Sequence, residues 1–103
     1  MMQINQNECT LAGRVFGIAL NESSNEFGDH PGYLNNFAFY VINDATGTKY
    51  NIFARDDVKL DDIAKWTSLA LTSFIEHKII EVRCKPFDNV EDTGNYYINS
   101  AKI

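Results

Sequence analysis

The order of two hydrophobic periodicities along the chain constrains its fold most strongly. Three successive segments alternate apolar and polar residues, a fourth spaces its apolar residues at a helical period, and two further segments return to alternation. Alternation of this kind is typical of half-buried strands. The predicted strands cover residues 9–20, 34–43, 49–55, 78–85 and 96–103, the helix covers 58–76, and polar, turn-rich loops cover 21–32 and 86–95. We therefore expect a mainly β protein with one helix between its third and fourth strands.

The first predicted strand changes its apolar parity part-way along. Its two apolar sets are Leu11, Gly13 and Val15, followed by Phe16, Ile18 and Leu20. One extra residue in a strand exchanges its two faces, so the pattern predicts a bulge at Gly17. A strand bent in this way can serve both halves of a small barrel.

Five strands with one helix after the third are the arrangement of an OB-fold, a five-stranded Greek-key barrel whose second and third strands form a ligand-binding face. An RNA-recognition motif is excluded, because its fold needs a helix between the first two strands and residues 21–32 are too polar to supply one. The length of 103 residues suits a single domain over residues 1–103.

The predicted helix carries an apolar stripe that we expect to face the barrel. Its members are Leu60, Ile63, Ala64, Thr67, Leu71, Phe74 and Ile75. Trp66 lies off this stripe, and we expect it to pack against the barrel or against another subunit. Acidic residues gather at the start of the helix, where the positive end of the helix dipole favours them.

The distribution of charge is more informative than its total. The chain has 14 acidic and 9 basic side chains, a net charge of −5, which excludes a uniformly basic nucleic-acid clamp. The predicted strands hold seven basic side chains against Glu81 alone, a net charge of +6, and the other segments hold two against thirteen, a net charge of −11. This separation indicates an anion-facing sheet surface. The alternative explanation for this separation of charge is chance, or the use of lysines to protect strand edges from pairing.

Aromatic and basic residues alternate on the outward side of the second and third predicted strands. Tyr40 points outward if its apolar neighbours point inward, and Phe53 points outward beside Lys49, Asn51 and Arg55. Aromatic rings stack on unpaired bases, and cations follow the phosphates. Phe53 could instead pack beneath the helix or in a subunit contact, and Tyr40 could be an ordinary half-exposed strand residue.

The fourth predicted strand and the loop after it add three candidates. Arg83 and Lys85 share one face of the strand, and Phe87 lies at the start of the loop before the fifth strand. That loop often closes over the ligand in an OB-fold. Packing in the core or against a subunit is the alternative for Phe87, and an ion pair with Glu81 is the alternative for Arg83.

The sequence carries no signature of catalysis or of metal binding. It has no glycine-rich phosphate loop, no nucleophile beside a histidine and no clustered metal ligands. We therefore expect no enzyme activity, no catalytic residue, no metal and no other cofactor. Cys9 and Cys84 are expected to be buried free thiols, with a disulfide between them as the alternative. Without a signal-peptide pattern or a bilayer-length apolar run, we expect a cytoplasmic protein that does not bind membranes.

Four segments together resemble the bacterial single-stranded DNA-binding proteins. Residues 10–15, 36–39, 50–54 and 79–82 resemble, in order, the first four strands of that family's OB domain. The resemblance implies sequence-independent binding of single-stranded DNA in replication, repair or recombination, and a homodimer or homotetramer. It places Arg14, Lys49, Asn51 and Phe53 at positions that face DNA in the family, and Phe87 near a stacking position.

The chain also departs from that family in three ways. The turn over residues 44–48 is shorter, the helical region is longer, and the sequence ends at Ile103 without the flexible linker and acidic tail. We therefore expect a small, tail-less form. A protein-interaction OB module of a replication complex, such as a primosomal replication protein, is the alternative function. RNA is an alternative partner to DNA. An OB-fold that binds structured RNA or a sugar polymer is a third possible function.

Overall fold

The structure is a computed structural model that describes residues 8–20, 33–87 and 94–103. Its elements are β1 (Cys9–Leu20), β2 (Tyr33–Asn43), β3 (Thr48–Arg55), α1 (Leu60–Glu76), β4 (Ile80–Pro86) and β5 (Asn95–Lys102). Every predicted strand and the predicted helix are present, with ends that differ by at most two residues. The loop predicted over residues 21–32 and most of the loop predicted over 86–95 lie outside the described residues.

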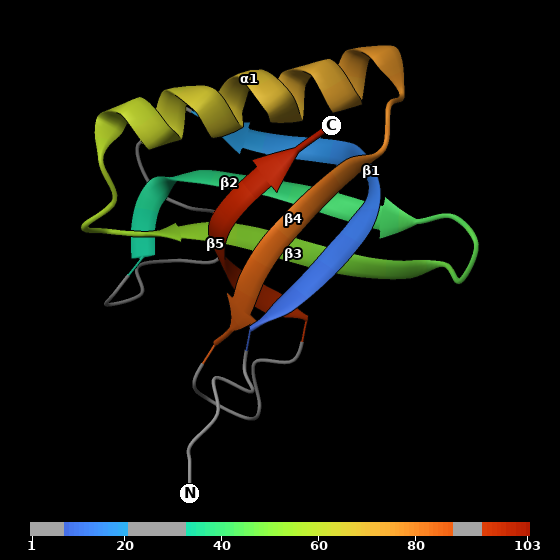
Figure 1. Ribbon diagram of the computed structural model, residues 1–103, viewed down its shortest axis with the longest axis horizontal. Coiled ribbons are helices and arrows are strands. Elements are labelled where there is room, and N and C mark those ends of the chain that lie inside the picture. Colours follow the sequence, from blue (N-terminus) through green and yellow to red (C-terminus); the bar gives the residue numbers. More distant parts are fainter. Residues whose placement is uncertain (1–7, 21–32, 88–93) are drawn as a thin grey trace, which may run out of the picture.

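The five strands form a closed barrel in the order β1-β2-β3-β5-β4, with β4 pairing back onto β1 (Figure 1). All pairs are antiparallel except β3 and β5, which run parallel. This confirms the predicted fold class, a mainly β barrel with one helix between its third and fourth strands, consistent with an OB-fold. Within the described segments, no helix has the length and apolarity that crossing a bilayer requires.

The predicted bulge in β1 is present. Val15 pairs with Val41 and Gly17 pairs with Tyr40, so Phe16 is the extra residue. The first half of β1 pairs with β4 and its second half pairs with β2, which is how one strand serves both halves of the barrel. A Cβ on Gly17 would lie 3.0 Å from the Tyr40 ring, so glycine lets that ring lie close against β1.

A buried hydroxyl ties the bulge to the end of the helix. The Val15 N–H donates a hydrogen bond to Ser73 Oγ at 2.9 Å, and Ser73 Oγ donates to the Lys78 carbonyl oxygen at 2.6 Å. Ser73 is fully buried. One side chain therefore satisfies backbone groups of β1 and of the segment that leads into β4.

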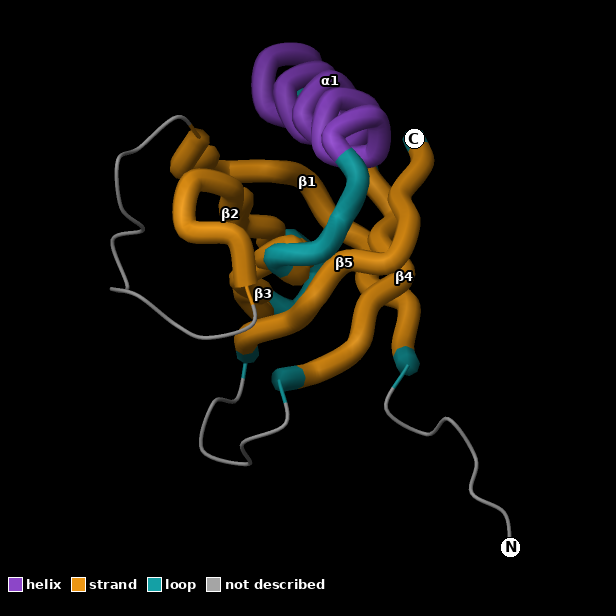
Figure 2. The backbone as a smooth tube through the Cα atoms, turned by 90° about the vertical axis from the view of Figure 1, so that its left-hand side faces the viewer, coloured by secondary structure: helices purple, strands orange, loops and turns teal. Residues whose placement is uncertain are grey.

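The face of α1 that packs on the barrel differs from the predicted stripe. The helix lies across one end of the barrel (Figures 1 and 2) and buries Trp66, Ala70 and Ser73. The Trp66 ring lies 6.4 Å from the ring of Phe37 in the core, so the expected packing of Trp66 against the barrel is confirmed.

Most of the predicted stripe is exposed instead. The exposed fractions are 81% for Leu60, 40% for Leu71, 42% for Phe74 and 68% for Ile75. The prediction was wrong because two contacts select the other face: the bulky indole of Trp66 fills the space beside Phe37, and the Ser73 hydroxyl reaches β1. Ile63 alone of the large stripe residues packs against the core.

We predict that Ser73→Ala lowers the free energy of unfolding by about 1–3 kcal/mol, because the buried Val15 N–H loses its acceptor. Urea denaturation followed by circular dichroism measures this change. Ser68→Ala, at an exposed position of the same helix, is the control and should stay within about 0.5 kcal/mol of wild type. Equal stability of the two variants would mean that the hydroxyl does not hold the bulge.

Candidate nucleic-acid interface

Side chains on the outer wall of the barrel line up across neighbouring strands. The pairing register places them in three rows: Arg14, Ile42 and Lys49; then Gly17, Tyr40, Asn51 and Asn95; then Ala19, Ala38, Phe53, Tyr97 and Lys85. The residues that alternate with them, such as Phe39 and Ile52, pack into the barrel core. The rows therefore form one continuous surface over β1, β2, β3, β5 and the end of β4.

Five aromatic residues lie on this surface, and we call them the outer aromatic face: Phe16, Tyr40, Phe53, Phe87 and Tyr97. Phe87 stacks on Tyr97 with ring centroids 4.3 Å apart and an interplanar angle of 22°, and it lies 5.3 Å from Phe53. Phe16 and Tyr40 form a second pair at 6.2 Å. The face is thus built from two adjoining groups of rings, because Tyr40 also packs against the cluster that contains Phe53, Phe87 and Tyr97.

The two groups differ in exposure. Phe53, Phe87 and Tyr97 are only 1%, 7% and 4% exposed, and they form an apolar cluster separate from the barrel core. Phe16 is 38% exposed, and Tyr40 is half-buried. The rings of the buried group are therefore hardly accessible, whereas Phe16 presents ring atoms to solvent and Tyr40 is intermediate between the two.

Cations sit on the edges of this face. The Lys49 Nζ lies 5.5 Å from the centre of the Phe16 ring, and the Arg55 guanidinium carbon lies 4.2 Å from the centre of the Tyr97 ring. Lys85 is directly opposite Tyr97 in the β4–β5 pairing. Among the described residues, no carboxylate is within ion-pairing distance of these three cations. Their charge is therefore available to an anion.

Arg14 and Asn51 are held by polar partners on the same surface. Arg14 donates from Nε and Nη2 to the two carboxylate oxygens of Asp44, at 2.7 and 3.1 Å. This hydrogen bonding and the charge of Asp44 raise the pKa of Arg14. The Asn51 amide donates to Asn95 Oδ1 at 2.8 Å. Arg14 is thus partly neutralised, and the two asparagines form a fixed amide pair between β3 and β5.

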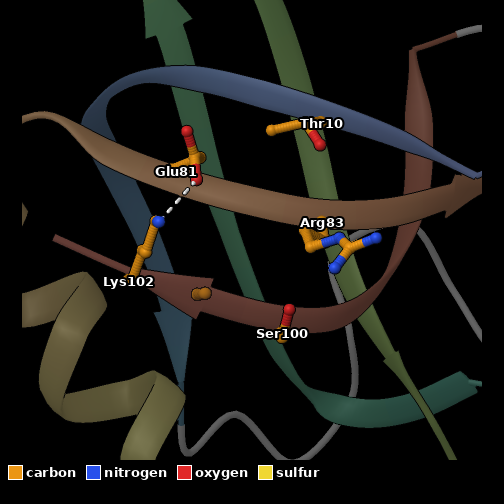
Figure 3. Close-up of a pocket in the computed structure, with 6 residues that line it drawn as sticks. Thr10, Glu81, Arg83, Ser100 and Lys102 are labelled. Carbon is orange, nitrogen blue, oxygen red and sulfur yellow. Dashed lines mark ion pairs between the residues drawn. The ribbon is translucent and has the colours of Figure 1, made fainter.

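Arg83 lies on a different part of the barrel wall. It lines a cavity of about 480 Å³ formed by the start of β1, the middle of β4 and the end of β5 (Figure 3); the lining residues are Thr10, Glu81, Arg83, Ser100, Ala101 and Lys102. Arg83 is 3.6 Å from a carboxylate oxygen of Glu8, and Lys102 is 3.4 Å from Glu81. Both cations of this cavity are paired with acids, so their charges are largely cancelled. This differs from Lys49, Arg55 and Lys85 at the outer aromatic face.

No protein-family model, curated protein or solved structure matches this chain. The barrel and its outer wall therefore carry the functional argument alone. Within the described ranges, no group of three or more His, Cys, Asp or Glu side chains is arranged to hold a metal ion.

The structure brings eight of the nine predicted site residues onto this one surface. Those eight are Arg14, Tyr40, Lys49, Asn51, Phe53, Arg55, Lys85 and Phe87, and the ninth, Arg83, is separated from them. Phe53 points outward from the barrel, as predicted. It is buried against Phe87 and does not pack beneath the helix. The alternative considered for Arg83 was an ion pair with Glu81, but Arg83 lies near Glu8, and Glu81 pairs with Lys102.

Sequence reasoning missed Phe16 and Tyr97 as members of the surface. Phe16 is the extra residue of the bulge, so its side chain points outward although the parity of the following residues suggested otherwise. Tyr97 and Tyr96 are adjacent aromatics, and only the register shows that Tyr97 faces outward while Tyr96 packs on the core. The sequence held no signal that distinguished the two tyrosines, because the pairing of Tyr97 with Lys85 is visible only in the structure.

Proposed function

We propose that this protein binds single-stranded DNA on the outer aromatic face, without strong sequence preference, without catalysis and without a cofactor. The observation that carries the proposal is a set of cations without acidic partners among the described residues, two of them seated over aromatic rings of one barrel wall. Stacking rings and phosphate-neutralising cations are the two elements that single-strand binding needs. In this proposal the chain is a small relative of the bacterial single-stranded DNA-binding proteins, acting in the cytoplasm.

The exposed rings and the buried rings have different roles in this proposal. Phe16 and Tyr40 stack on bases, because they present ring atoms to solvent. Phe53, Phe87 and Tyr97 are too deeply buried to stack on bases, and Tyr97 holds the Arg55 guanidinium in place. Removing the buried Phe53 ring would destabilise the fold, so its substitution does not report on stacking alone.

The remaining polar groups suit a ligand of variable sequence. Three long basic side chains lie beside the rings: Lys49 at Phe16, and Arg55 and Lys85 at Tyr97. Side chains of this length can follow a flexible phosphate backbone. The Asn51 and Asn95 amides offer donors and acceptors that any base can use. A surface of this kind favours unpaired strands over duplexes, because stacking requires exposed base faces.

We predict that the double variant Lys49→Gln, Arg55→Gln weakens binding to oligo-dT and makes its salt dependence shallower. A cation that neutralises one phosphate of a single strand contributes about 0.7 to the slope of log K against log salt, so the slope should fall by about 1.4. Fluorescence anisotropy of a labelled oligonucleotide across a salt series measures both quantities.

The matched control for this experiment is Lys102→Gln, which removes a strand cation that is paired with Glu81 on the other part of the wall. Its affinity and slope should match those of wild type. Equal effects of the two variants would place the ligand elsewhere, and equal affinity of wild type for duplex and single strand would contradict the proposal. RNA oligonucleotides and a sugar polymer as competitors test the alternative ligands.

A second candidate function, protein association, is favoured by the exposed apolar surface of α1. Leu60, Leu71, Phe74 and Ile75 form what we call the α1 apolar stripe, and all four are at least 40% exposed. Large exposed apolar side chains that gather on one helix face mark interaction sites. We further propose that a second copy of this chain covers the stripe, which gives a homodimer, one of the two assemblies that the family resemblance implies.

Size and charge along the helix favour an antiparallel pair. If the two antiparallel helices cross midway between Thr67 and Leu71, Phe74 of one copy lies opposite Ala64 of the other. A large side chain then meets a small one. Asp61, in the acidic first turn, then lies near the partner's Lys78, whereas a parallel pair would bring the two acidic first turns together.

We predict that wild type sediments with twice the mass of one chain and that the double variant Leu71→Ser, Ile75→Ser sediments as a monomer. Both substitutions remove exposed apolar groups, so the fold itself should remain intact by circular dichroism. Lys65→Ser, an exposed position of the same helix outside the stripe, is the control and should leave the dimer unchanged. A wild-type monomer, or a dimer that survives the double variant, would contradict this interface.

A further inference from the structure

Cys9 and Cys84 face each other across two paired strands. They are direct partners in the antiparallel β1–β4 ladder, and their sulfur atoms are 3.7 Å apart. Both are free thiols, although 75 positions separate them in the sequence; Cys84 is buried as predicted, whereas Cys9 is only half-buried. Neither the barrel core nor the outer aromatic face requires two sulfur atoms at this position, since other small apolar side chains would fill the space.

The backbone already holds the geometry that a disulfide needs. Directly opposed residues of an antiparallel pair have Cα atoms about 4.5 or 5.5 Å apart, and disulfides span Cα separations of about 4.4–6.8 Å. Both kinds of opposed pair fall within that range. Bond formation therefore requires small side-chain rotations and no movement of β1 relative to β4.

We infer that Cys9 and Cys84 form a redox-modification site that hydrogen peroxide closes into a cross-strand disulfide. In the first step the Cys9 sulfur attacks one peroxide oxygen, the O–O bond breaks, and Cys9 becomes a sulfenic acid with release of water. In the second step the Cys84 sulfur attacks the Cys9 sulfur, the S–O bond breaks, and a second water leaves with the thiol proton. Two thiols are oxidised and one peroxide is reduced.

The surroundings of the two thiols assign the order of these steps. Cys9 is half-buried, whereas Cys84 is fully buried. Burial raises the pKa of the Cys84 thiol, with smaller contributions from Cys9 and from the charge of Glu8. Tyr96 packs on the same part of the core, and burial, with added contributions from the two cysteines, raises its pKa as well. Cys9 is therefore the thiol that meets peroxide, and Cys84 is the thiol that resolves the intermediate.

The bond would join the beginning of β1 to the end of β4. Cys84 is followed directly by Lys85 and, three positions on, by Phe87, both on the outer aromatic face. A covalent link there closes a long loop of the chain and restrains that edge of the surface. Oxidation is thus expected to stabilise the barrel and to leave its fold unchanged.

The test is peroxide treatment of the folded full chain, followed by alkylation with iodoacetamide in urea and intact-mass spectrometry. We expect the treated chain to be lighter by two hydrogen atoms and to take up no alkyl group, and dithiothreitol to restore two alkylation sites. The melting temperature of the treated chain should rise by about 10 °C or more.

Cys9→Ser keeps a polar atom of similar size at a half-buried position and is the variant for comparison, since substitution of the buried Cys84 could impair folding. Treated Cys9→Ser should form no intramolecular disulfide and show no rise in melting temperature. Two alkylatable thiols in the treated wild type would overturn the inference. A disulfide between two copies, seen on a non-reducing gel, would overturn it as well.

Discussion

The β1 bulge is the constraint on which the rest of the structure depends, and the Ser73 hydroxyl holds it. β1 pairs with β4 up to Gly13 and with β2 from Arg14 onward, which closes the barrel, and the extra residue Phe16 follows directly after this change of partner. The Val15 N–H next to the bulge is satisfied by Ser73, and the same oxygen donates to the Lys78 carbonyl. The helix is therefore fixed to the strand at the place where the strand bends. The same bend turns Phe16 outward, beside Tyr40, where the candidate site begins.

The aromatic residues of the barrel fall into an inner set in the core and an outer set on the outer wall. The outer set makes that wall apolar and aromatic. Phe53, Phe87 and Tyr97 are buried without belonging to the barrel core, so they give the outer wall a rigid apolar layer. Arg55 over Tyr97 and Lys49 over Phe16 then hold positive charge at defined positions. With Lys78 outside β4, the strands keep six basic side chains against Glu81 alone, within a chain of net charge −5. The excess of acidic side chains belongs to the helix, the turns and the loops, so the net positive charge of this chain lies on its strands.

Periodicity predicted the order of elements, the bulge and most of the candidate surface, because alternation directly reports which residues share one face of a strand. It could not predict the buried face of α1, since Leu71, Phe74 and Ile75 make the opposite face at least as apolar as the face that carries Trp66, Ala70 and Ser73. Tertiary contacts to Phe37 and Val15 decided between those two faces. Alternation also placed Arg83 and Lys85 on one side of β4 without showing which residues of β5 lie opposite them, Ser100 beside the cavity and Tyr97 on the outer aromatic face. The Cys9–Cys84 contact also needed the register between strands that are far apart in the sequence.

The central claim is that the outer aromatic face is the surface that contacts single-stranded DNA. Backbone amide NMR shifts of the labelled full chain during titration with oligo-dT test it most directly, because every strand reports separately. The account predicts shifts concentrated at Phe16, Tyr40, Asn51 and Arg55, with small changes at Thr10, Arg83 and Ser100 and along α1. Shifts centred instead on the cavity beside Arg83 or on the helix, with the outer aromatic face unchanged, would contradict it.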